Sequence, residues 1–146
     1  ELSFDVEALL SAEYMSEVGV RLSFYKRFAS AADEAEIDDL AQELENRFGA
    51  PPLEAKRFVE LMRLKVELRR LRVLGCEATA KSVSLLLRDD TPLDPAKVRE
   101  LIARKRSPYR LTPDGRLTRR LLETEAAADG LVLASKTLEE LLACLT

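Results

Sequence analysis

Apolar and polar residues follow a helical period over two successive stretches near the start of the chain. A period of about 3.6 residues with one apolar face is typical of an amphipathic helix that packs on a core. Residues 20–32 place an apolar arc on one side of a helical wheel, made by Phe24, Tyr25, Phe28, Ala29, Ala31 and Ala32. The next stretch has an apolar stripe of Ile37, Leu40, Ala41, Leu44 and Phe48. The pattern therefore predicts two short helices.

End signals separate these two helices and close the second one. Asp33 and Glu36 have the spacing of a capping box, in which the two side chains satisfy free backbone N–H groups at a helix start. Gly49 tolerates the left-handed conformation that often follows a helix, and Pro51 and Pro52 cannot prolong it. We expect the second helix to begin after Asp33 and to end at Gly49.

A third helix is predicted from Leu53 to about Arg72, with Pro52 near its first position. Its buried stripe consists of Phe58, Leu61, Leu64, Leu68 and Leu71, broadened by Val59 and Met62. Leucine and methionine at this spacing indicate a core and not a cofactor site.

Strand-like alternation precedes the helices. Residues 1–6 alternate apolar and polar side chains, which indicates a half-buried strand. Residues 8–19 are then expected to form a loop or a short helical turn that carries Tyr14 and Met15 toward the core.

Two hairpins are predicted after the third helix. Residues 73–78 and 82–87 are rich in β-prone residues and are separated by a short turn. The turn tripeptide of residues 113–115 predicts a second hairpin over residues 109–122.

Two further helices complete the pattern. Asp94 and Pro95 are typical of an N-cap followed by proline at the first helical position, which opens a helix through about Arg104. Asp129 and Gly130 precede the last helix, in which apolar residues recur at a spacing of three or four: Leu131, Ala134, Leu138, Leu141 and Leu145.

Together these elements predict an α+β fold, with three helices followed by short strands interleaved with two further helices. We expect one compact domain over residues 1–146, long enough to bury roughly two-thirds of its unfolded surface. It would comprise an opening strand and loop (1–19), a helical part (20–72) and a mixed part (73–146).

Composition narrows the class of protein. An apolar share of 47% with 34% charged residues is typical of a globular domain. The chain contains no run of about 18 apolar residues, so no membrane span is expected. The N-terminus has neither a secretory signal nor an initiating methionine, so we expect a piece of a longer protein. Cys76 and Cys144, in apolar surroundings, are typical of reduced thiols in a cytosolic protein.

Residues that could carry out catalysis are few. The chain contains no histidine, which is the commonest general base and metal ligand. Two distant cysteines cannot build a zinc site of the usual kind, and no phosphate-binding glycine motif occurs. We therefore expect no catalytic residue, no metal and no cofactor in this chain.

A basic tract covers residues 97–120, whereas acidic residues predominate in residues 1–60. Its candidate phosphate contacts are Arg104, Lys105, Arg106, Arg110, Arg116, Arg119 and Arg120, with Tyr109 as a stacking group. Because the tract spans a helix end, a turn and a strand, its charges need not share one face. The alternative function is therefore a nucleic-acid-binding module that uses this tract. The tract can also be a solvated surface, or its charges can pair with acidic residues elsewhere in the parent protein.

A polar row lies on the second predicted helix and consists of Glu36, Asp39, Glu43, Asn46 and Arg47. Most such rows are solvated faces, and Glu43 and Arg47 form an ordinary i, i+4 pair that contributes about 0.2–0.5 kcal/mol. The row is also a candidate docking surface, and helical spacing alone does not distinguish the two.

Longer strings carry a resemblance to a known family. They are Arg21-Leu-Ser-Phe-Tyr-Lys-Arg-Phe-Ala-Ser-Ala, Glu43-Leu-Glu-Asn-Arg-Phe-Gly-Ala-Pro-Pro-Leu-Glu and Leu61-Met-Arg-Leu-Lys. Together they resemble the C-terminal domain of the bacterial transcription-repair coupling factor family, densely from about Tyr14 to Leu71. The resemblance implies a cytoplasmic parent, an ATP-dependent DNA translocase that displaces stalled RNA polymerase and recruits the excision-repair machinery. The helicase-type motifs of such a parent are expected outside this chain.

For this domain, the resemblance implies a non-catalytic, autoinhibitory role. In that family the domain packs on an N-terminal module resembling the B component of the excision-repair machinery, and covers the surface that binds the A component of that machinery. The family's contact motif falls on Glu43, Asn46 and Arg47, and the family usually has Asp where Asn46 stands. That change removes one negative charge, which leaves open whether an ion pair or a neutral hydrogen bond forms there.

Overall fold

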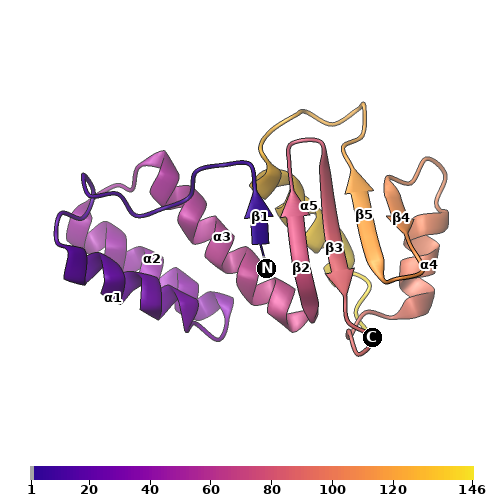
Figure 1. Ribbon diagram of the computed structural model, residues 1–146, viewed down its shortest axis with the longest axis horizontal. Helices are drawn as coiled ribbons and strands as arrows, with labels where there is room; N and C mark the ends of the chain where they lie inside the picture. Colours follow the sequence, from indigo (N-terminus) through magenta and orange to yellow (C-terminus); the bar gives the residue numbers. More distant parts are fainter. Residues whose placement is uncertain (1) are drawn as a thin grey trace. The chain divides into compact units, whose positions relative to one another are not determined.

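The computed structural model describes residues 2–146, within which five helices and one five-stranded sheet occur (Figure 1). The predicted α+β class is confirmed. The chain divides into two units, a helical unit of residues 7–66 and a sheet unit formed by residues 1–6 and 67–146.

The helical unit contains α1 (Val18–Ala29), α2 (Glu34–Phe48) and most of α3 (Leu53–Arg70). All three helices were predicted, but the first is shorter at its C-terminal end than its apolar arc indicated. Ala29 and Ala32 are exposed, so the buried part of the arc is narrower. The chain leaves the helix after Ala29 because it must turn before the cap of α2.

Local signals at both ends of α2 act as predicted. The Asp33 carboxylate accepts a hydrogen bond from the Glu36 backbone N–H at 2.9 Å, and the Glu36 carboxylate accepts one from the Ala32 N–H at 2.8 Å. Gly49 ends the helix with φ +84°, a region that favours glycine. The Tyr14 hydroxyl donates to the Gly49 carbonyl at 2.8 Å, so the preceding loop is bound to this helix end.

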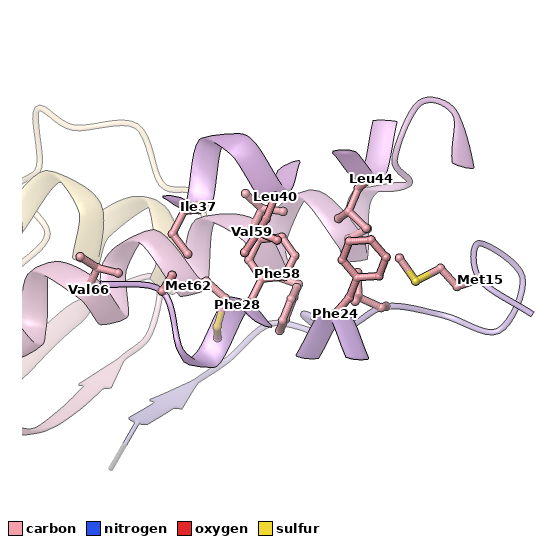
Figure 2. Close-up of a cluster of buried hydrophobic side chains, with 13 residues drawn as sticks. Met15, Phe24, Phe28, Ile37, Leu40, Leu44, Phe58, Val59, Met62 and Val66 are labelled. Carbon is pink, nitrogen blue, oxygen red and sulfur yellow. The ribbon is translucent and has the colours of Figure 1, made fainter. Parts of the chain in front are cut away.

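The core of the helical unit is built from all three helices and the loop before them (Figure 2). Phe28 and Phe58 meet edge to face, with ring centroids 5.3 Å apart. Met15, brought in by the loop, is fully buried. The other buried members are Leu10, Phe24, Ala31, Ile37, Leu40, Leu44, Ala55, Val59, Met62 and Val66.

The sheet unit has the strand order β1-β2-β3-β5-β4. Its strands are β1 (Leu2–Phe4), β2 (Val73–Ala78), β3 (Ser82–Leu87), β4 (Tyr109–Leu111) and β5 (Arg116–Arg120). Both predicted hairpins are present as antiparallel pairs. The opening strand is also confirmed, although Glu1 lies outside the described residues. Its parallel pairing with β2 was not predicted.

Two helices complete this unit, α4 (Pro95–Ala103) and α5 (Gly130–Leu142). The Asp94 and Asp129 side chains cap them by accepting backbone hydrogen bonds, as predicted. Gly130 is needed at its position because a Cβ there would lie 2.6 Å from the Ala78 carbonyl oxygen. Its N–H donates to the Asp5 carboxylate at 3.0 Å, which links the start of α5 to the segment after β1.

An ionic cluster is buried between β5 and α5. The Arg119 side chain is 1% exposed, and its guanidinium donates two hydrogen bonds to Glu125, both at 2.9 Å. It donates a third to Glu140 at 2.7 Å, and the Tyr109 hydroxyl donates to the same Glu140 oxygen at 2.8 Å. The cluster therefore ties the segment between β5 and α5 to the sheet.

Candidate functional site

The three residues singled out by the resemblance lie on the last turns of α2 and face solvent. Asn46 and Arg47 are exposed, and Glu43 is half-buried. All three are therefore accessible on the helical unit. Their differing surroundings decide what each one can do.

Glu43 is held by an arginine from the neighbouring helix. Arg27, in the last turn of α1, donates two parallel hydrogen bonds to the Glu43 carboxylate, both at 2.7 Å. The predicted i, i+4 pair is also present, with Arg47 Nη1 3.3 Å from Glu43 Oε2. Hydrogen bonding from Arg27, followed by that from Arg47, lowers the pKa of Glu43 to about 2. Glu43 therefore stays ionised at any physiological pH.

The guanidinium groups of both arginines lie over aromatic rings. The guanidinium carbon of Arg27 lies 5.1 Å from the centroid of the Phe24 ring. That of Arg47 lies 5.4 Å from the Phe24 centroid and 5.2 Å from the Phe48 centroid. Cations over aromatic faces are attracted by about 0.5–1 kcal/mol at exposed sites. We call Arg27, Glu43 and Arg47 the arginine cluster; it carries one net positive charge and packs on the rings of Phe24 and Phe48.

Asn46 is neutral, and its side-chain hydrogen bond lies within α2. Its side-chain oxygen accepts a hydrogen bond from Gln42 at 3.0 Å, one turn earlier on α2. Gln42 lines a groove of about 530 Å³ between α2 and α3, together with charged residues that include Glu45, Lys56 and Glu60. Asn46 therefore bonds to a residue of this groove of mixed charge.

Sequence reasoning found Glu43, Asn46 and Arg47 but missed Arg27. The helical pattern places Arg27 outside the apolar arc of its helix and indicates no partner for it. The available signal was the opposite charge of facing rows on two consecutive, packed helices. That signal does not show which of several acidic residues on α2 pairs with Arg27, because the pairing depends on how the two helices cross.

We expect the Arg27→Ala variant to raise the pKa of Glu43 from about 2 toward its ordinary value of 4.5, because the largest cause of the shift is lost. Titration of the Glu43 side-chain carboxyl by NMR measures this directly. Lys26→Ala is the matched control, since Lys26 is an exposed neighbour outside the cluster. An unshifted pKa in the unsubstituted protein would contradict the geometry. Stability should change by less than about 1 kcal/mol, because the pair is solvent-exposed.

Two members of the basic tract are not available for the predicted contacts to nucleic acid. The prediction that Arg119 contacts phosphates is wrong, because that side chain is buried among carboxylates. Tyr109 is 5% exposed and binds Glu140, so its proposed stacking role is also wrong. Both residues point to the buried face of their strands. Exposed arginines of the tract lie on the opposite side of the same strands, Arg110 on β4 and Arg120 on β5.

Cys76 and Cys144 are free and buried, in agreement with the predicted reduced thiols. In residues 2–146 no group of acidic or cysteine side chains is arranged to hold a metal ion. A search of the same residues finds no helix long and apolar enough to cross a membrane.

Comparisons with known proteins agree on one family. Residues 4–98 match the family model described as the TRCF domain. The chain is 37% identical over 144 residues, 99% of its length, to a transcription-repair-coupling factor of Myxococcus xanthus. It is 31% identical over 117 residues, 80% of its length, to that of Escherichia coli. The chain spans only 12% and 10% of the length of these two relatives.

A solved structure has the same fold. The crystal structure of the C-terminal domain of transcription-repair coupling factor superposes with a TM-score of 0.75, at 18% sequence identity. The match covers 98% of this chain and 94% of the other. Identity at this level supports the fold alone.

Proposed function

Because this chain belongs to the transcription-repair-coupling factor family, we propose that residues 1–146 act as its C-terminal regulatory domain and carry out no catalysis themselves. In this proposal the domain packs on the N-terminal module of the same protein that resembles the excision-repair B component, through Glu43, Asn46 and Arg47. We call that module the B-like module. The contact masks the surface to which the excision-repair A component binds. RNA polymerase and DNA are partners of the parent protein.

The arginine cluster is the observation that carries this proposal. Both Glu43 oxygens are already engaged by Arg27, so Glu43 mainly positions the two guanidinium groups. Arg47 uses one of its five N–H donors on Glu43 and stays exposed, which leaves donors for a partner. A carboxylate of the B-like module is the matching group, since bidentate arginine–carboxylate pairs are strong and directional. Asn46 adds a neutral hydrogen bond at the edge.

The expected strength suits a reversible mask. Interfaces between domains of one chain are typically polar and bury roughly 600–1,500 Å². A bias of about 1–3 kcal/mol toward the closed state is enough to change the affinity of a competing partner about 5- to 150-fold. A second contact elsewhere on the protein can therefore release the domain.

A competition experiment tests the masking. The 146-residue chain is titrated in trans against the isolated B-like module, and the excision-repair A component is then added. Mutually exclusive binding is expected, so that the A component displaces the chain. A stable ternary complex of the chain, the B-like module and the A component would show that the domain does not cover that surface.

A further inference from the structure

The sheet unit has a second face that the proposed masking contact does not use. Side chains that point toward α5 are buried, namely Cys76, Ala78, Val83, Leu85, Leu117 and Arg119. In Figure 1, strands β2 and β3 lie in front of α5. The residues that alternate with these point to the opposite side and are exposed or half-buried. We call them the open sheet face: Ser3, Glu77, Ser82, Ser84, Leu86, Arg110, Arg116, Thr118 and Arg120.

Strand register gathers three arginines on one half of this face. Arg110 on β4 pairs with Thr118, which lies between Arg116 and Arg120 on β5. Two residues along a strand span about 7 Å, and neighbouring strands are about 5 Å apart. The three arginines therefore form a triangle, in which Thr118 lies at the middle of the side between Arg116 and Arg120.

Hydroxyl groups extend this basic area onto the next strand. Ser84 on β3 pairs with Thr118, and Ser82 pairs with Arg120. Arg116 donates a hydrogen bond to the Ser84 hydroxyl at 3.0 Å, which holds it against the sheet. The area is thus lined by hydrogen-bond donors on both sides of β5.

Acidic groups are scarce around the three arginines. Glu77 is the acid of the open sheet face, and it lies on β2, two strands away from β5. Asp114, in the turn before β5, interacts electrostatically with Arg116. Across residues 2–146, no ion pair engages Arg110 or Arg120. The area therefore carries an uncompensated positive charge.

The side chains around the three arginines indicate which kind of partner this area binds. Arginine guanidinium groups together with serine and threonine hydroxyls are typical contacts to phosphate oxygens. The face carries no aromatic residue, because Tyr109 points to the buried side, and the only large apolar side chains described beside it are Leu86 and its neighbour Leu74. Protein partners usually need buried aromatic or aliphatic anchors, and unpaired bases need aromatic rings to stack on. A paired duplex needs neither.

We propose that the open sheet face binds the phosphodiester backbone of duplex DNA through Arg110, Arg116 and Arg120. Binding is independent of base sequence, because the contacts reach phosphates alone. Non-specific affinities of this kind correspond to dissociation constants of about 10⁻⁴–10⁻⁶ M. Three phosphate contacts give a slope of about −2.7 for log affinity against log salt concentration, or roughly a 40-fold loss from about 50 to about 200 mM salt.

Fluorescence anisotropy of a labelled 20-base-pair DNA duplex with the 146-residue chain tests this proposal. The face variant reverses Arg110, Arg116 and Arg120 to Glu, and the matched control reverses Arg104, Lys105 and Arg106 to Glu. Both change the net charge equally, but the control residues lie after α4 and outside the open sheet face. We expect the face variant to lose more than about tenfold in affinity and most of its salt dependence, and the control less than about threefold.

Additional measurements check that the variants fold and define which results would contradict the proposal. Circular dichroism checks folding, and Arg→Gln substitutions at the same three positions replace the reversals if these do not fold. Equal weakening by the control would assign binding to the whole tract and overturn the proposal. So would tighter binding of single-stranded DNA, or displacement of the duplex by a poly-glutamate peptide at equal charge. None of these results bears on the masking contact, which lies on the helical unit.

Discussion

We expect the Arg47→Glu substitution in the full-length protein to raise the affinity for the excision-repair A component by at least about fivefold, which corresponds to losing a coupling of about 1 kcal/mol. The new carboxylate stands beside Glu43 and faces the proposed acidic partner, so an attraction becomes a repulsion. The closed state is weakened while Arg27 still holds Glu43. Biolayer interferometry with the A component immobilised measures the change.

The comparison needs a variant with the same change in charge. Lys81→Glu provides it, because Lys81 is exposed in the turn between β2 and β3. This control should leave the affinity for the A component unchanged. If Arg47→Glu is folded and binds the A component no better than the unsubstituted protein, the arginine cluster is not the masking contact.

A large effect on stability is expected at Arg119. The Arg119→Met substitution leaves Glu125, which is 9% exposed, without its main partner, and deprives Glu140 of a hydrogen bond. Breaking a buried ion pair from one side typically costs about 3–5 kcal/mol. We expect about 3 kcal/mol, because Glu140 is 35% exposed and Lys136 still pairs with Glu125. Urea unfolding measures the free energy of unfolding.

Control variants distinguish the effect of the unpaired buried carboxylates on stability from the effect of lost side-chain packing. Arg120→Met, at the next and exposed position, should change stability by no more than about 0.5 kcal/mol. Adding Glu125→Gln and Glu140→Gln to Arg119→Met should recover part of the loss, since the uncompensated carboxylates become neutral. A loss below about 1 kcal/mol for Arg119→Met alone would mean that the cluster is weakly coupled to folding.

The same cluster predicts an acid dependence of stability. Hydrogen bonding from Arg119 lowers the pKa of Glu125 to about 2, below the ordinary 4.5 expected in the unfolded chain. Its contribution is therefore complete above about pH 4.5 and is lost as the pH falls toward 2. Arg119→Met should remove most of this dependence.

Local elements of the fold were predictable because their causes are local. Asp33 and Glu36 lie within one turn, so their capping bonds depend on few dihedral angles. The hairpins likewise join neighbours in the chain. By contrast, β1 pairs with β2 across some seventy residues, and no nearby residue encodes that partner. Parallel pairing of distant strands depends on how the whole sheet assembles.

The amino-acid pattern alone determined the order of helices and strands, their caps and the stripe that carries Glu43, Asn46 and Arg47. Helical and strand periods follow from backbone geometry, which needs no knowledge of the fold. Only the tertiary structure decided which charges meet, because Arg27 reaches Glu43 and Arg119 reaches Glu140 from separate elements. Charged residues can be counted from the sequence, but packing decides which residues they pair with. Packing also decides whether a charged side chain lies on a contact surface or in the core.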